Sequence, residues 1–110
     1  MKLYSTNSIT EDVWSTIDKF FRFTELPCLP QGHSADGFLP ETIESTKLGI
    51  QITGRMTFLG GQSGYFEHQG ILYLSKPHFS SIENITVKKI ENAQLKEAFL
   101  VNNFLHIQIG

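Results

Sequence analysis

A helical period marks the first run of hydrophobic positions in the chain. From Ile9 to Phe21, apolar residues recur at spacings of three and four, and the positions between them are mostly polar or charged. This spacing places the apolar side chains on one face of an α-helix, which we expect to face the core. Because Ser8 and Glu11 have the spacing of a capping box, the helix is expected to begin there. The apolar face consists of Ile9, Val13, Trp14, Ile17, Phe20 and Phe21.

A period of two then predicts a half-buried strand from Lys47 to Leu59. A straight strand of this length would span about 43 Å, and Gly54 on its apolar side permits a bend or a bulge. We therefore expect the sheet to be curved. The apolar side of this strand consists of Leu48, Ile50, Ile52, Met56 and Phe58.

Two further segments have short strand-like runs bounded by turn residues. Residues 65–74 predict a hairpin whose loop is His68-Gln69-Gly70, because the glycine follows two polar residues between apolar runs. Residues 85–90 predict one more strand. Both segments are expected to add to the same sheet.

The C-terminal residues predict a second hairpin. Residues 95–101 and 104–109 are apolar in part and are separated by Asn102 and Asn103, which tolerate the positive φ of a two-residue turn. Since neither face is wholly polar, either both are covered or an apolar patch remains for a partner or a second copy. One face carries Ala98, Leu100, Leu105 and Ile107, and the other carries Phe99, Val101, Phe104 and His106.

Together these elements predict an α+β fold, in which one N-terminal amphipathic helix packs on a curved, mainly antiparallel sheet. The sheet is expected to have about five or six strands, with a partial barrel as the alternative arrangement. A chain of 110 residues can bury a hydrophobic core without metals or crosslinks, so we expect a single domain over residues 1–110.

Charge and cysteine content narrow the function classes. A net charge of -2 and an isoelectric point near 6.0 give no general attraction to nucleic acid, which is therefore not an expected partner. The single Cys28 cannot form an intrachain disulfide and suits a reducing compartment. The first ten residues lack the features of a signal peptide, and no apolar stretch approaches membrane-spanning length. We expect a cytoplasmic protein without membrane contact.

No group of residues has the pattern of a catalytic or metal site. Residues 32–37 combine a histidine, a serine and an aspartate, but Asp36 stands where a nucleophile elbow needs glycine, so we interpret the segment as a polar turn. None of the four histidines has a partner at the spacing typical of zinc ligands. We therefore expect no metal, no cofactor and no enzymatic activity. The histidines are His33, His68, His78 and His106.

Residues 24–46 are the least periodic segment, and their prolines and glycines predict a long connection. The segment has four acidic residues, no lysine or arginine, and interleaved apolar side chains, a surface that would dock a basic protein. We therefore predict a protein-binding module of the immunity or inhibitor type, which neutralises a partner such as a bacterial toxin nuclease by covering its surface. The alternative is that the segment only wraps the sheet. The predicted contacts are Glu25, Asp36, Phe38, Glu41 and Glu44.

Two other functions are open alternatives. A small-ligand-binding sheet or barrel would need a cavity near the glycine-rich turn at residues 60–64, for which a filled core is the competing interpretation. An enzyme assembled across a homo-oligomer would bring histidines together between subunits, and the C-terminal hairpin is the segment expected to mediate such self-association. The predicted cavity lining is Met56, Phe58, Tyr65, Phe66 and Tyr73.

Overall fold

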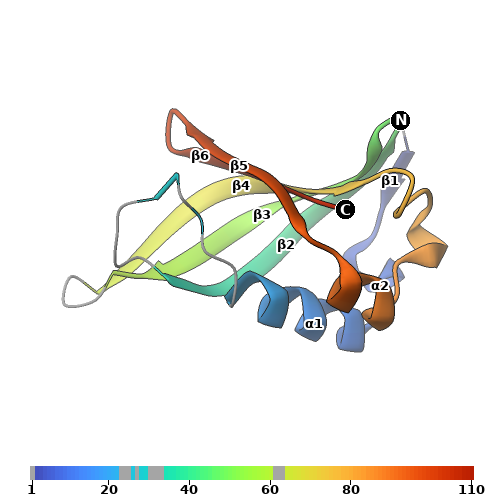
Figure 1. Ribbon diagram of the computed structural model, residues 1–110, viewed down its shortest axis with the longest axis horizontal. Helices are drawn as coiled ribbons and strands as arrows, with labels where there is room; N and C mark the ends of the chain where they lie inside the picture. The colour runs from blue at the N-terminus through green and yellow to red at the C-terminus, as the bar shows by residue number, and fades with distance from the viewer. Residues whose placement is uncertain (1, 23–25, 27, 30–33, 61–63) are drawn as a thin grey trace.

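A six-stranded sheet forms the centre of the molecule, and two helices lie on one of its faces (Figure 1). The computed structural model describes residues 2–22, 26, 28–29, 34–60 and 64–110. The strands are β1 (Lys2–Tyr4), β2 (Ser34–Thr46), β3 (Gly49–Leu59), β4 (Tyr65–Ser75), β5 (Leu95–Val101) and β6 (Phe104–Ile109). The helices are α1 (Glu11–Arg22) and α2 (Val87–Asn92), with short 3-10 turns η1 (Thr6–Ser8) and η3 (Ile82–Asn84).

The strand order is β1-β2-β3-β4-β6-β5, and every neighbouring pair is antiparallel except β4 and β6. The connection after β4 carries α2, and the β5–β6 hairpin then places β6 parallel to β4. The predicted α+β fold with a mainly antiparallel sheet is confirmed. The sheet is open, with β1 and β5 at its edges, so the described strands do not form a closed barrel.

The hydrophobic core lies between the helices and the face of the sheet that they cover. Val13, Ile17 and Phe21 from α1 are buried, as the helical period predicts. The ring of Phe21 packs against those of Phe38 and Phe58, with centroids 6.3 Å and 5.6 Å away. The sheet contributes Ile43, Ile50, Ile52, Met56, Phe58, Leu72, Leu74, Leu105, Ile107 and Ile109.

Helix α1 begins at Glu11, two residues later than a cap at Ser8 predicts. Ser8 belongs to η1, and the hydroxyl of Thr10 accepts the backbone N–H of Val13 at 3.4 Å. The predicted cap at Ser8 is wrong because η1 already uses this residue, and Thr10 is the next one that can satisfy a free N–H of the first helical turn.

The prediction of a long connection at residues 24–46 is wrong for its second half, which is strand β2. Two register shifts against β3 leave Asp36 and Glu41 without a paired residue. Each β-bulge adds one residue and reverses the alternation, so the period of two is hidden in the sequence. Pro40 is tolerated because it lies beside a bulge, opposite Gly54.

Two local predictions after β3 are also wrong. The segment predicted as a strand at residues 85–90 contains the start of α2, because the Thr86 hydroxyl caps the helix by accepting the N–H of Lys89 at 3.2 Å. The residues predicted as a hairpin loop, His68-Gln69-Gly70, lie inside the continuous strand β4. There the glycine allows close approach of β6 rather than a turn.

The C-terminal hairpin is confirmed in detail. Asn102 and Asn103 have φ values of 51° and 64°, the left-handed conformation that a two-residue turn of this type requires. Leu105 and Ile107 face the core, while Phe99 and Val101 are exposed on the other side. Of the two alternatives for this hairpin, the structure therefore has the one in which an apolar patch remains exposed, on the hairpin face that points away from the helices.

Candidate functional site

The sheet has a second face, which no helix of the described residues covers, and we call it the open face (Figure 1). Side chains of residues paired across neighbouring strands point to the same face, so the strand register defines rows that cross it. The first row is Glu44, Gln51, Tyr73, Gln108 and Glu97. The second row is Thr42, Thr53, Ile71, His106 and Phe99. The third row is Leu39, Arg55, Gln69, Phe104 and Val101.

Large hydrophobic side chains that are exposed gather on this face. Within the described part of the chain, every one of them except Leu48 belongs to the open face, and Leu48 lies in the turn between β2 and β3, where it is 78% exposed. Scattered exposed leucines are ordinary, and this set is spread from the β1 edge to the β5 edge. Phe99 and Val101 lie together on β5, opposite His106 and Phe104, and an exposed apolar patch of this kind is typical of an interaction surface. The residues on the open face are Leu3, Leu39, Leu59, Tyr65, Phe99 and Val101.

Three rings from neighbouring strands stack at the centre of this surface. The imidazole of His106 lies between Phe99 and Tyr73, with centroid distances of 4.6 Å and 5.9 Å and interplanar angles of 7° and 12°. Phe104 contacts the same imidazole at 5.1 Å. We call these four residues, together with Val101, the aromatic patch.

A hydrogen bond fixes the orientation of the stack. The hydroxyl oxygen of Tyr73 lies 3.2 Å from Nδ1 of His106. Burial raises the pKa of Tyr73 above its ordinary value of 10.0, so the hydroxyl keeps its proton and can donate it to this bond. The bond and the stacking restrain the side chains of Tyr73, His106 and Phe99, and restrained side chains lose less entropy when a partner binds.

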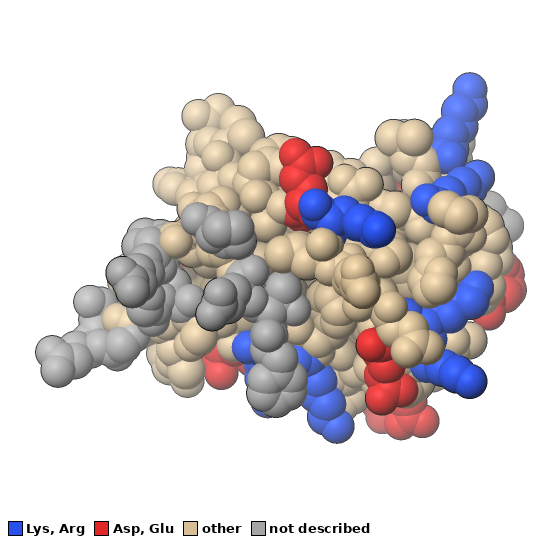
Figure 2. Space-filling view, in the orientation of Figure 1, with Lys and Arg blue, Asp and Glu red and all other residues tan. Residues whose placement is uncertain are grey.

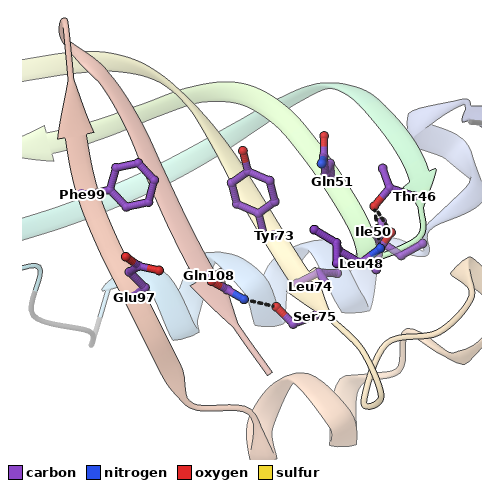
Figure 3. A pocket seen from close by; sticks show the side chains of 11 residues that line it. Thr46, Leu48, Ile50, Gln51, Tyr73, Leu74, Ser75, Glu97, Phe99 and Gln108 are labelled. Atoms are coloured by element: carbon purple, nitrogen blue, oxygen red, sulfur yellow. Dashed lines mark hydrogen bonds between the residues drawn. The ribbon is translucent and has the colours of Figure 1, made fainter.

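A pocket of about 220 Å³ opens beside the aromatic patch (Figure 3). Glu97 and Phe99 of β5 stand on one side of it, and Leu48 of the β2–β3 turn stands on the other (Figure 3). Most small-molecule sites enclose about 300–1,000 Å³, so this pocket is small for a free ligand. The remaining lining residues are Thr46, Gly49, Ile50, Gln51, Tyr73, Leu74, Ser75 and Gln108.

Internal hydrogen bonds shape two walls of the pocket. The side-chain amide N–H of Gln108 donates to the hydroxyl of Ser75 at 2.9 Å, which leaves the amide oxygen of Gln108 as a free acceptor (Figure 3). In the turn, the Thr46 hydroxyl accepts the N–H of Leu48 at 3.2 Å and donates to the carbonyl of Gly49 at 3.1 Å. These bonds hold polar groups in the walls of a pocket whose lining is otherwise largely apolar.

Charged side chains of both signs lie around the pocket, because Glu44 and Glu97 are on the open face and Lys47, Lys76 and Lys96 adjoin lining residues in sequence. Arg55 is paired with Glu67 at 3.8 Å, whereas Glu44 and Glu97 form no ion pair with a described residue. The hairpin from Ala98 to Gln108 contains no charged residue, and the corresponding projection at the upper left of Figure 2 shows none. The surface therefore combines an uncharged apolar projection with two unpaired carboxylates.

The predicted partner contacts do not form one surface. Glu25 lies outside the described residues. Phe38 is only 8% exposed and packs in the core, so its prediction as an exposed anchor is wrong. Asp36 and Glu41 are the bulge residues of β2, and Glu44 lies on the open face in the row that crosses the pocket. Partner binding by these three carboxylates stays a prediction.

The backbone carbonyl of Asp36 takes part in a hydrogen bond that stabilises the fold. It accepts the Arg22 Nε–H at 2.8 Å, and the carboxylate of Asp18 accepts the backbone N–H of Phe38 at 2.9 Å. Burial raises the pKa of Asp18 above its ordinary value of 3.8, and the bond from Phe38 and the charge of Arg22 offset part of this rise. The bulge thereby joins β2 to the end of α1.

The cavity predicted near the glycine-rich turn is wrong. Met56 and Phe58 are fully buried under the helices, and Phe66 packs against the same core. Tyr65 and Tyr73 point to the opposite face of the sheet and lie at opposite ends of β4. Residues from both faces cannot line one cavity, and of these five residues only Tyr73 lines the pocket beside the aromatic patch.

The histidines and the cysteine of the described residues do not converge on a metal site. His33 lies outside the described residues, and His68, which the sequence placed in a turn, is in strand β4. In the described ranges no three residues among histidines, cysteines, aspartates and glutamates are placed to hold a metal ion. Cys28 is half-buried, and burial raises the pKa of its thiol above 9.0. His106 is half-exposed and stacks on Phe99, with which it shares the predicted hairpin face.

The hairpin pattern placed Phe99, Val101, Phe104 and His106 on one face, but it did not predict that Tyr73 or the polar residues of the pocket join them. Gln51, Gln108 and Glu97 come from three strands and become neighbours only through the strand order, in which β6 is inserted between β4 and β5. No local motif links them. The available signal was the alternation within each strand, which assigns each residue to the face away from the core.

Neither helix of the described residues has the length and hydrophobicity that a membrane crossing requires. Comparisons with known protein families, characterised proteins and solved structures find no match to this chain.

Proposed function

We propose that this protein is a binding module that recognises another protein, with a basic surface, through the open face of its sheet. The observation that carries the proposal is the position of the exposed hydrophobic side chains. With the exception of Leu48, those of the described residues lie on the open face, and two of them, Phe99 and Val101, belong to the aromatic patch at its β5 edge. Aromatic anchors surrounded by polar residues are the usual composition of the energetic centre of a protein interface.

The charge of the open face supports a basic partner. The only cation in the three rows, Arg55, is paired with Glu67, so Glu44 and Glu97 are the carboxylates left for a partner. Unpaired carboxylates around an apolar centre raise the rate of association with a positively charged protein and select against acidic ones. The same charges would repel nucleic acid.

Such a module acts as an inhibitor when it covers the working surface of its partner. Proteins of the immunity type, which neutralise a basic toxin nuclease, are the example that this combination of small size, acidic surface and apolar centre favours. A cytosolic location is part of the proposal, since the chain has one cysteine and that thiol is free.

The test is affinity capture from the native host with three tagged proteins: wild type, Phe99→Ala and Glu83→Gln. Phe99 is the exposed ring of the patch, and Glu83 is an exposed residue of η3, on the connection that carries α2. Loss of an aromatic anchor at an interface centre costs about 2 kcal/mol or more, or ~30-fold in affinity. We expect wild type and Glu83→Gln to retain the same basic protein in a fixed ratio, and Phe99→Ala to lose it.

Two results would overturn the proposal. One is the recovery of a stoichiometric partner that Phe99→Ala retains as well as wild type does. The other is the recovery of this chain alone, as a monomer or a homo-oligomer, when the mass of the eluted complex is determined. Circular dichroism of Phe99→Ala confirms that any loss of binding is not caused by unfolding.

A further inference from the structure

We propose that the pocket beside the aromatic patch receives an arginine side chain of the partner. This inference rests on the proposed function, because it names the chemical group by which a basic partner is anchored to the open face. The pocket of about 220 Å³ lies in the first row of the open face, which ends at Glu97. A socket of this size suits one long side chain rather than a cofactor or a metabolite.

The acceptors around the pocket favour a cation with several N–H donors. Glu97 contributes a carboxylate without an ion-pair partner among the described residues, and Gln108 contributes an amide oxygen, because its amide nitrogen is engaged by Ser75. Gln51 adds a second amide on the far side of Tyr73 (Figure 3). A guanidinium can donate to the Glu97 carboxylate and to the amide oxygen of Gln108, which is paired with Glu97 on the neighbouring strand, whereas a neutral ligand forms no ion pair with the carboxylate.

The aromatic rings favour arginine over lysine. Phe99 and Tyr73 both line the pocket, and His106 holds them in near-parallel planes. A planar guanidinium stacks on such rings while it donates hydrogen bonds in its own plane, and an ammonium cannot do both. Leu48 at the rim contacts the aliphatic stem of a long side chain, since it is exposed and apolar.

The chain's own cations do not occupy the socket. Lys96 lies next to Glu97 in sequence, but it is the bulge residue of β5, and its Cε is 3.6 Å from the position a Cβ of Gly110 would take. It therefore runs along the end of β6. Lys47 is exposed in the β2–β3 turn, and neither lysine forms an ion pair with Glu97.

The test uses three capped amino acids as probes, each titrated into the isotope-labelled protein and followed by two-dimensional amide NMR. N-acetyl-argininamide carries the guanidinium, N-acetyl-lysinamide carries an ammonium, and N-acetyl-citrullinamide has the shape of arginine without its charge. We expect saturable shifts with the arginine probe, with a Kd on the order of 1–10 mM. The shifts should fall on residues 49–51, 73–75, 97–99 and 108.

Matched variants then assign the contact. Glu97→Gln should weaken binding of the arginine probe about two- to fivefold, the effect expected of one exposed ion pair, while Glu83→Gln should leave the Kd unchanged. Phe99→Leu, which keeps an apolar side chain but removes the ring, should weaken binding and abolish the preference over the lysine probe. Because Glu97 and Phe99 are exposed, both variants are expected to fold.

The outcomes separate this inference from the proposed function. Equal binding of arginine and citrulline probes, equal binding of arginine and lysine probes, or shifts outside the pocket would each overturn the arginine socket. If Phe99→Ala still loses the captured partner in that case, the open face binds its partner by other contacts and only the socket is wrong. If the arginine probe binds as expected and no partner is captured, the proposed function is wrong and the inference falls with it.

Discussion

Replacing Phe99 by alanine should lower stability far less than replacing Phe58, although both are phenylalanines of the same sheet. Phe58 is fully buried beneath α1, whereas Phe99 is 40% exposed on the open face. Truncation of a buried phenylalanine costs about 3–5 kcal/mol. Full burial of such a side chain contributes about 1.5–3 kcal/mol, so a ring that is 40% exposed contributes about 1–2 kcal/mol, including its contact with His106.

Urea unfolding followed by the fluorescence of Trp14 measures this difference. The indole of Trp14 is half-buried and its N–H donates to the carbonyl of Thr6 at 3.1 Å, so its emission should change when α1 leaves the sheet. If Phe58→Ala does not fold, Phe58→Leu provides the comparison at a smaller cost. A loss of 3 kcal/mol or more in Phe99→Ala would refute the reasoning, because it would show that the aromatic patch belongs to the core.

Three further changes test how the fold is built. Gly54→Ala should lower the free energy of unfolding by about 1–3 kcal/mol, because a Cβ at this position would overlap the Leu39 carbonyl and the ring of Phe38. Thermal unfolding measures this loss, and an unchanged midpoint would contradict the close packing around Gly54. Asn103→Val should cost about 1–2 kcal/mol in urea unfolding, since φ is 64° there, and a neutral effect would argue against the two-residue turn. The pKa of Asp18 is raised by burial, so the folded state binds more protons than the unfolded chain from pH 3.8 up to that raised pKa, and stability falls as pH rises through this window. Asp18→Asn should remove that fall in unfolding measured at a series of pH values, and an unaltered pH profile would assign it to another group.

Alternation and spacing predict this fold wherever an element is regular. The face of α1, the strand β3 from Gly49 onward and the turn at Asn102 and Asn103 follow directly from local patterns. Leu48, predicted on the apolar side of that strand, is instead exposed in the turn before it. Strand β2 was hidden because two bulges reverse the alternation, and α2 was hidden because one cap at Thr86 outweighs a β-branched run. These are features in which a single residue decides the conformation of its neighbours.

The candidate site was predictable only in its apolar half. Phe99 and His106 pair within one hairpin, so their shared face can be derived from the turn alone. Tyr73 and Gln51 join them through the parallel pairing of β4 with β6. This pairing brings Tyr73 into contact with His106, although the two residues are 33 positions apart in the sequence. Strand order of this kind is set by the packing of the whole sheet rather than by any local spacing.

The affinity of the captured partner for two charge-reversed variants tests the central claim most directly. Glu97→Lys reverses a carboxylate at the pocket on the open face, and Glu83→Lys makes the same change on η3. If the open face binds a basic protein, Glu97→Lys should raise the Kd by about tenfold or more, while Glu83→Lys should leave it near the wild-type value. Equal Kd values for the two variants, or a loss confined to Glu83→Lys, would contradict the assignment of the open face as the binding surface.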